Sequence, residues 1–392
     1  MSIIIFGDSF TFPDGNAATN RVHTYAKGFY ENGISVHVIC FASQYSNSGN
    51  GITNGIHYYH PFGQSKRSIY FLLRQQQKIL KYFYALKLIR EINKIDGVSA
   101  IICYTHILQT QLYAFVIAII INTKLILERS EHPLRRYQDS FCLRIQGRAK
   151  VYVETKLYDG FFCISNYLID FYKSRGVSNK KLFLVPSTVD TERFQIPIVS
   201  QFPFEYILYS GSLTVKKDGV DILIKSFAKI CGKYSEINLV LIGKGDNLDD
   251  EIIIENLVRK LKIEHRVYFT GQIPRSEIPK YLSNAKILAL ARPQSLVSDA
   301  GFPSKLTEYL ATGKPVVVTK VGEISLYLRD NENAFLTNPD SIDEFADKLD
   351  FVLSNYKLAT QVGEKGKELT SAIFNYAFQV TRMIDFIIKI DG

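Results

Sequence analysis

Charged side chains gather around one short predicted helix in the second half of the chain. Residues 291–319 have the sequence ARPQSLVSDAGFPSKLTEYLATGKPVVVT, in which an apolar strand is followed by Arg292 and a helix begins near Ser304 and ends before Pro315. Lys305 lies in the first turn of that helix. The N-terminus of a helix is partially positive, so an adjacent lysine and arginine predict an anion site, suited to a diphosphate that gains charge as it leaves.

Glu308 follows Lys305 by about one helical turn. Its carboxylate would lie slightly deeper in the same site and could accept hydrogen bonds from ribose hydroxyls. The alternative is a purely electrostatic role near the helix start, worth ~0.3–1 kcal/mol.

A second basic loop follows another predicted strand. The strand YILYS is followed by GSLTVKKDG and then by the helical pattern VDILIKSFAKI. Gly211 would allow a ligand close to the backbone, and Lys216 or Lys217 could reach a phosphate as a point charge. A solvated turn with surface lysines is the alternative for this loop taken alone.

The first half has two weaker candidates at the ends of predicted strands. The loop GDSFTFPDGNAATN contains Gly15 and Asn16, although a plain turn between strand and helix explains it equally well. The segment LERSEHPLRR places Glu128, Glu131 and His132 at the carboxyl end of a strand, where doubly wound folds bind ligands. The alternative is that Glu128 and Glu131 form surface ion pairs with Arg129 and Arg135, and the two interpretations stay open. His57 and His60 are expected to be aromatic strand residues and not metal ligands, because no carboxylate lies near them in the sequence.

These residues need a scaffold of strands that alternate with helices. Runs such as LVLIG and PVVVT are apolar at successive positions, as in parallel strands buried on both faces. Their alternation with helical patterns predicts an α/β protein with two doubly wound, Rossmann-like domains facing each other across a cleft. The proline-containing segment 194–205 is the predicted linker. We expect an N-terminal domain over 1–200, a C-terminal domain over 201–375, and a terminal helix over 376–392. The predicted strands are 2–6, 35–42, 99–104, 124–127, 161–165, 182–186, 206–210, 238–242, 267–270, 287–291 and 315–319.

The positive charge of the chain lies in its first half. The 392 residues have a formal net charge of +9, and residues 1–200 hold 23 basic against 13 acidic residues. No Asp or Glu occurs from Asn32 to Arg90, and within this span residues 66–90 (KRSIYFLLRQQQKILKYFYALKLIR) interleave seven basic residues with aromatic and aliphatic ones. This composition is typical of a basic amphipathic helix that rests on an anionic membrane surface, where each basic residue adds ~1 kcal/mol. The alternative is an ordinary helix with a solvated basic face. No nucleic-acid-binding signature occurs, so nucleic acid is not an expected partner.

Location is predicted from cysteine usage and hydropathy. The five cysteines are far apart and lack metal-ligand spacing, as in reduced cytosolic proteins. The N-terminus lacks the features of a secretory signal, and the most apolar stretch, residues 112–121, is about half of the ~20 residues that a membrane-spanning helix needs. We expect a cytoplasmic protein, peripheral on the inner face of the membrane.

The second half resembles a known family. The blocks GSL with KDG, LVLIGKGD, VYFTGQIP and FPSKLTEYLATGKPVVVT are similar to the donor domain of family 4 retaining glycosyltransferases of the GT-B fold, in the subgroup with a GFPSKL-type loop. The resemblance covers most of residues 206–345. It implies that the domain over 1–200 binds the acceptor, that the domain over 201–375 binds the nucleotide-sugar donor, and that the helix over 376–392 returns to the first domain. It implies that the protein transfers a sugar from a UDP- or GDP-linked donor to a glycan acceptor, lipid-linked and used in surface polysaccharide synthesis, without a metal or other cofactor.

The resemblance also implies roles for individual residues. Glu308 matches the second glutamate of the family's E-x7-E pair, whereas the first position holds Ala300, with Asp299 beside it. Lys217 matches the diphosphate lysine, and Arg292 takes over the charge of an arginine that is replaced here by Ser212. The implied catalytic residues are Lys217, Glu308, Arg292 and His132. The implied donor-binding residues are Gly211, Ser212, Lys216, Gln272, Gly301, Phe302, Pro303, Ser304, Lys305 and Leu306. The implied acceptor-side residues are Gly15, Asn16, Glu128 and Glu131.

Two other functions stay open. One is a membrane-associated subunit that binds a nucleotide sugar without catalysis, which Ala300 and Ser212 favour because acidic and basic residues are usual there. The other is a GT-B-like sugar-nucleotide epimerase, for which no similar set of carboxylates and histidine is found in the sequence.

Overall fold

The computed structural model describes residues 2–15, 17–42, 49–62, 68–134, 137, 140–195 and 199–390. The chain divides into two compact units, of which the first comprises Met1–Thr188 with Tyr376–Gly392 and the second comprises Val189–Asn375. The change of unit at Val189 lies ahead of the expected boundary at 200, because the short 3-10 helix η2 (Thr191–Phe194) packs against helices of the second unit.

The first unit is built on an eight-stranded sheet in the order β3-β4-β2-β1-β5-β6-β7-β8. All neighbouring pairs are parallel except β3 with β4. Every residue of β1, with the sequence SIIIFG, is buried, as expected for a central strand covered on both faces. The strands are β1 (Ser2–Gly7), β2 (Ser35–Cys40), β3 (Gly51–Thr53), β4 (Ile56–Tyr59), β5 (Val98–Cys103), β6 (Lys124–Arg129), β7 (Gly160–Cys163) and β8 (Leu182–Leu184).

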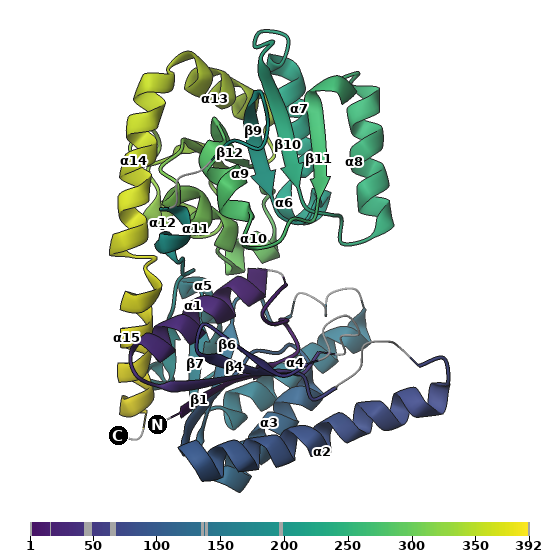
Figure 1. The fold of residues 1–392 in the computed structure, drawn as a ribbon, viewed down its shortest axis with the longest axis vertical. Helices are drawn as coiled ribbons and strands as arrows, with labels where there is room; N and C mark the ends of the chain where they lie inside the picture. Colours follow the sequence, from purple (N-terminus) through teal and green to yellow (C-terminus); the bar gives the residue numbers. More distant parts are fainter. Residues whose placement is uncertain are drawn as a thin grey trace. The chain divides into compact units, whose positions relative to one another are not determined.

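The last helix of the chain completes the core of the first unit. In α15 (Tyr376–Lys389) the apolar residues Val380, Met383 and Ile387 recur at helical spacing and are buried in the same cluster as side chains of β1 and α1. Figure 1 shows α15 beside α1. The helices of this unit are α1 (Ala17–Glu31), α2 (Phe71–Asp96), α3 (Leu108–Ile121), α4 (Phe141–Leu157), α5 (Asn166–Lys173) and α15, with the 3-10 helix η1 (Asn179–Lys181).

The second unit is built on a six-stranded, fully parallel sheet in the order β11-β10-β9-β12-β13-β14. The carboxyl ends of all these strands meet at one edge, which is where such a fold places its ligand groups. The strands are β9 (Glu205–Ser210), β10 (Ile237–Ile242), β11 (Val267–Gly271), β12 (Ile287–Leu290), β13 (Val316–Thr319) and β14 (Phe335–Thr337). The helices are α6 (Val215–Asp218), α7 (Val220–Ile230), α8 (Leu248–Lys260), α9 (Ile278–Asn284), α10 (Leu296–Ala300), α11 (Ser304–Ala311), α12 (Ile324–Tyr327), α13 (Ile342–Ser354) and α14 (Tyr356–Ala372), with η3 (Glu264–Arg266).

The two parallel, doubly wound sheets confirm the predicted fold class. All eleven predicted strands are present in the structure, whereas β3, β4 and β14 were not predicted. Of the two histidines expected in a strand, His57 lies in β4, but the expectation for His60 is wrong, because β4 ends at Tyr59. Among the described residues, no helix is both long enough and apolar enough to span a membrane.

The predicted basic helix corresponds to α2, and its two halves differ. Its buried residues, Ala85, Ile89 and Ile92, all lie in the second half of the helix. Large apolar side chains of the first half are exposed, and they occupy more than one stripe of the helix. The prediction of a single apolar face is therefore wrong for α2. Lys66 and Arg67 lie outside the described residues.

Candidate functional site

Two predicted cations of the second unit meet around a buried carboxylate at the carboxyl edge of its sheet. Lys305 Nζ, from the first turn of α11, donates to Asp218 Oδ2 at 2.9 Å and to the Tyr209 hydroxyl at 2.8 Å. Arg292, which follows β12, places its Nε 3.6 Å from Asp218 Oδ1. The side chains converge because β9 and β12 are adjacent parallel strands. We call Tyr209, Asp218, Arg292 and Lys305 the cation cluster.

The electrostatics of the cation cluster are set by burial. Asp218 is 3% exposed, and although desolvation alone would raise the pKa of its carboxyl, Lys305 and Arg292 outweigh that effect and lower it. Desolvation lowers the pKa of Lys305, and Asp218 opposes the shift. A buried arginine and a partly exposed lysine thus face one buried carboxylate, which leaves an excess of positive charge among these three side chains. Such a site favours an anion, and most strongly one that gains negative charge during a reaction.

Asp218 was missed as a site residue. It follows Lys216 and Lys217 directly in the segment after β9, and an acidic residue directly after two lysines near the end of a strand was the available signal. Of those two lysines, Lys216 is exposed, whereas the Lys217 carbonyl accepts a hydrogen bond from Arg292 Nε at 3.3 Å. The structure therefore gathers Arg292 and Lys305 and leaves Lys216 at the surface.

Two glycines allow the close backbone approach at this edge. Gly211, at the end of β9, has φ of +153°, and a Cβ there would collide with the Lys305 ammonium group. Gly219 has φ of +63°, and a Cβ there would collide with the Ala291 carbonyl oxygen. Beside Gly211, the Ser212 carbonyl accepts the hydrogen bond of the Tyr209 hydroxyl at 2.7 Å. Glycine is required at both positions.

Most side chains of the loop before α11 are buried in the second unit. Gly301, Phe302, Pro303 and Leu306 are buried, and the Phe302 ring centroid lies 5.4 Å from those of Tyr327 and Phe374. Pro303 occupies the N-cap of α11, so no side chain caps this helix start. Because their side chains are buried, these four residues can contact the predicted sugar donor only through backbone atoms. The side chains of Ser304 and Lys305 are partly exposed.

Glu308 is held by an arginine that the sequence did not suggest. Arg193 Nη1, from η2, donates to Glu308 Oε1 at 2.6 Å, and Nη2 donates to the Arg275 carbonyl at 2.9 Å. Both partners of the pair are partly buried. The ion pair fixes the orientation of the carboxylate, whose proposed contact with ribose stays a prediction.

The residues expected near the sugar lie in contrasting surroundings. Ala300 is fully buried in α10, and Asp299 accepts a hydrogen bond from the Gln294 amide. Gln272, directly after β11, is exposed. Among the described residues, no group of three or more His, Cys, Asp or Glu side chains could hold a metal ion.

In the first unit, Glu128 has a structural role. It is fully buried in β6 and accepts hydrogen bonds from Arg21 Nε at 2.8 Å and from the Tyr25 hydroxyl at 3.1 Å. The expected surface pair with Arg129 is wrong, because Arg129 is itself buried and pairs with Glu154. A carboxylate in the core needs such a partner, and its lone pairs are used there rather than toward an acceptor.

His132 and Glu131 lie beside a small cavity at the carboxyl edge of the first sheet. The cavity, of about 170 Å³, is lined by His132, Lys150 and His106, a residue that follows β5 and was not predicted. Glu131 Oε2 lies 3.3 Å from His106 Nε2. Burial, with a smaller contribution from Arg175, lowers the pKa of His132 to about 4, so its imidazole is neutral at pH 7. His106 was detectable as a polar residue after a predicted strand.

The predicted loop after β1 is only partly described. Gly15 is exposed, and a Cβ there would collide with the hydroxyl oxygens of Thr11 and Thr19. Asn16 lies outside the described residues, as does Arg135, the predicted partner of Glu131.

The fold is that of known glycosyltransferases. Sucrose-phosphate synthase from Thermosynechococcus elongatus superposes with a TM-score of 0.74 at 17% sequence identity, over 100% of this chain and 99% of that one. This likeness defines the class of the fold, an α/β two-domain fold of the GT-B type.

The similarity in sequence lies mainly in the second unit. Residues 189–369 match the family model described as glycosyl transferases group 1. An uncharacterized glycosyltransferase of Methanocaldococcus jannaschii is 28% identical over 162 residues, which are 41% of this chain and 39% of the relative. A GDP-mannose-dependent alpha-(1-6)-phosphatidylinositol monomannoside mannosyltransferase of Mycobacterium tuberculosis is 23% identical over 234 residues, 57% of this chain and 60% of the relative. The chain therefore spans less than two-thirds of the length of these relatives.

Proposed function

We propose that the protein is a retaining glycosyltransferase that moves a sugar from a nucleotide-diphosphate sugar to a glycan acceptor. The observation that carries the proposal is the cation cluster, in which Arg292 and Lys305 surround Asp218 at the carboxyl edge of the sheet in the unit that matches the glycosyl transferases group 1 model. The named mannosyltransferase relative uses GDP-mannose, which supports a nucleotide-sugar donor.

The chemistry follows from the charge of the leaving group. As the sugar–oxygen bond breaks, the nucleoside diphosphate gains negative charge, which Lys305, Arg292, Lys217 and the start of α11 would stabilise. We propose a front-side reaction in which the leaving phosphate oxygen accepts the proton of the acceptor hydroxyl. Glu308, oriented by Arg193, would hold the donor ribose. His132 would face the acceptor as a neutral imidazole.

The acceptor is proposed to be lipid-linked and used in surface polysaccharide synthesis. The mannosyltransferase relative is named for a phosphatidylinositol-based acceptor. The chain has no acidic residue from Asn32 to Arg90, and the first half of α2 exposes both basic and apolar side chains. These features support a cytoplasmic enzyme, peripheral on the inner face of the membrane, that meets anionic lipid through residues 66–90.

Incubation with a panel of UDP- and GDP-sugars tests the enzymatic proposal. We expect release of the nucleoside diphosphate with one of the donors. Because no metal is expected to take part, the release should persist in the presence of EDTA. The anomeric configuration of the product, determined by NMR, should match that of the donor. Lys305→Met should abolish release, whereas the exposed α8 residue changed in Lys260→Met should not matter. Binding without release would instead support a non-catalytic nucleotide-sugar-binding subunit, and an epimerised donor would support an epimerase.

Sedimentation with anionic vesicles tests the membrane proposal separately. Neutralising five basic residues of residues 66–90 should abolish sedimentation, whereas neutralising five exposed basic residues of α8 and α14 should not, although the net charge changes equally. The first set is Lys66, Arg67, Arg74, Lys78 and Lys81. The control set is Arg259, Lys260, Lys357, Lys365 and Lys367. Equal sedimentation of both variants would contradict membrane contact through residues 66–90.

A further inference from the structure

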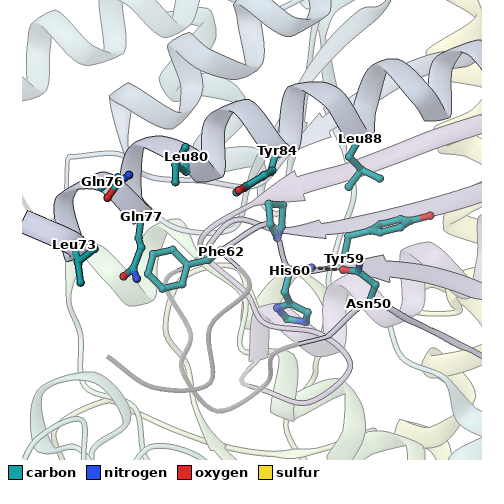
Figure 2. Close-up of a pocket in the computed structure, with 11 residues that line it drawn as sticks. Asn50, Tyr59, His60, Phe62, Leu73, Gln76, Gln77, Leu80, Tyr84 and Leu88 are labelled. Atoms are coloured by element: carbon teal, nitrogen blue, oxygen red, sulfur yellow. Dashed lines mark hydrogen bonds between the residues drawn. The ribbon is translucent and has the colours of Figure 1, made fainter. Parts of the chain in front are cut away.

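The first unit contains a cavity of about 610 Å³ between α2 and the end of β4 (Figure 2). This volume lies within the usual range of ligand pockets. One side is formed by α2 and the other by the segment that follows β4, including His60 and Phe62. We call it the α2 groove. Its lining residues are Asn50, Tyr59, His60, Pro61, Phe62, Leu73, Gln76, Gln77, Leu80, Tyr84 and Leu88.

One stripe of α2 faces the groove. Leu73, Leu80, Tyr84 and Leu88 recur at spacings of seven and four residues, so they lie along one side of the helix. In a packed core such a stripe would be covered, but Leu73 is 44% and Tyr84 58% exposed. The groove thus presents apolar surface that the described part of the unit does not cover.

Further apolar side chains stand where α2 begins. Ile69, Tyr70, Phe71 and Leu72 are all more than half exposed, and Ile69 reaches 82%. Single exposed apolar side chains are common on protein surfaces. A contiguous group of them beside an apolar groove indicates a binding site for a membrane, a protein or an apolar ligand. Each Å² of this surface removed from water contributes roughly 25 cal/mol.

Gln77 adds a polar observation at the same place. Its side chain points from α2 toward Phe62 (Figure 2), and its buried Oε1 atom has no hydrogen-bond partner in the structure. A buried amide oxygen without a donor costs roughly 1–3 kcal/mol. An amphipathic occupant, with one donor of its polar head at Gln77 and an apolar chain along the leucine stripe, would satisfy both.

The α2 groove lies at the edge of the sheet that carries the acceptor-side candidates. The β4 strand is parallel to β2, which is parallel to β1, so the residues after β4 lie at the same edge as the loop after β1. His60 Nε2 is 2.8 Å from the Phe12 carbonyl oxygen of that loop, which leads to Gly15.

We propose that the α2 groove binds the hydrocarbon chain of the lipid-linked acceptor. This inference rests on the proposed function and adds the part of the substrate that the first unit recognises. The hydrocarbon chain lies along the leucine stripe of α2, and a phosphate-bearing head is favoured by basic residues of the same helix, such as Arg74 and Lys78. A protein that takes up one chain from the bilayer in this way selects acceptors by the chain as well as by the glycan.

The absence of tryptophan from the chain provides a direct test. Tyr84→Trp places a single fluorophore in the α2 groove, and Phe83→Trp places one on the adjacent exposed residue, 65% exposed and outside the lining. The probe is 12-bromododecyl phosphate below its micelle concentration, with 4-bromobutyl phosphate as the short-chain control. We expect the long-chain probe to quench most of the Tyr84→Trp emission saturably, and to leave Phe83→Trp emission nearly unchanged. The short-chain probe should quench neither.

A pair of neighbouring leucines completes the test. Adding Leu73→Glu to Tyr84→Trp should abolish the quenching, whereas adding Leu72→Glu should not, because Leu72 does not line the groove. Equal quenching of both tryptophan variants, or none of Tyr84→Trp, would overturn the proposal. Quenching only by brominated phosphatidylglycerol vesicles, equal in the two variants, would assign α2 to the bilayer surface instead. Nucleotide binding, measured on the same variants, is a separate readout, so loss of that binding would count against the proposed function and not against the groove.

Discussion

Removing the carboxylate of the cation cluster should destabilise the free protein and strengthen its response to a diphosphate. Asp218→Asn keeps the shape of the side chain but leaves Lys305, 2.9 Å away, and Arg292, 3.6 Å away, without a counter-charge. Breaking a buried ion pair costs ~3–5 kcal/mol, and since the Lys305 side chain is still 16% exposed we expect the lower end, about 3 kcal/mol. The loss should appear in the unfolding of the second unit.

The pH dependence has a defined sign. Because the pKa of Asp218 is lowered in the folded protein, its stabilising effect is present above the unfolded pKa and is lost as pH falls through the folded pKa. The wild-type protein should therefore lose this contribution in acid, whereas Asp218→Asn has none to lose. The difference in stability between the two proteins should shrink as the solution is acidified.

Urea unfolding followed by circular dichroism measures the loss, fitted with two transitions because two units can unfold separately. Thermal shift with inorganic pyrophosphate measures the anion response, which should be larger in Asp218→Asn than in wild type and smallest in Lys305→Met. The control is Glu255→Gln, which breaks an exposed pair with Arg259 on α8, a type of pair worth ~0.3–0.5 kcal/mol. If Asp218→Asn were as stable as this control, or responded less to pyrophosphate than wild type, the assignment of the cluster would be refuted.

Three further predictions concern single residues. Arg193→Met should raise the KM for the nucleotide sugar and also lower stability, because it removes the partner of the partly buried Glu308 carboxylate and frees that carboxylate to reorient. An unchanged KM would argue against ribose binding by Glu308. The pKa of His132 in the folded protein is about 4, so the pH–rate profile should show no inflection from His132 near pH 6.5. The contribution of His132 to stability should be fully present above pH 6.5 and should be lost as the pH falls toward 4. An inflection near pH 6.5 that disappears in His132→Gln would contradict the assignment. Glu128→Gln should lower stability, because breaking a buried pair such as that with Arg21 costs ~3–5 kcal/mol. In the folded fraction, the KM for the acceptor should be unchanged. A selective change in that KM would show that Glu128 does contribute to acceptor binding.

The sequence by itself determined the scaffold. Apolar runs such as those of β1 and β10 can be buried only when both faces of a sheet are covered, so their alternation with helical segments was enough to predict parallel, doubly wound sheets. The strands β3, β4 and β14 were missed because their sequences, GIT, IHYY and FLT, contain no run of three successive aliphatic residues.

The sequence also determined the local part of the site. Lys305 at the start of α11 and Glu308 one turn later follow from the period of a helix, and Arg292 follows from the end of a strand. The excess charge and the exposed basic surface of α2 are likewise properties of a short stretch of residues.

Only the tertiary structure decided which charges meet. Asp218 and Lys305 are 87 residues apart, Arg193 and Glu308 are 115 apart, and Arg21 and Glu128 are 107 apart. No periodicity extends over such separations, because these contacts depend on which strands are neighbours and on which side chains are buried with a partner. Burial then gives Glu128 a structural role, makes Asp218 the centre of the cation cluster, and opens a groove beside an α2 stripe that the sequence predicted only as part of a surface.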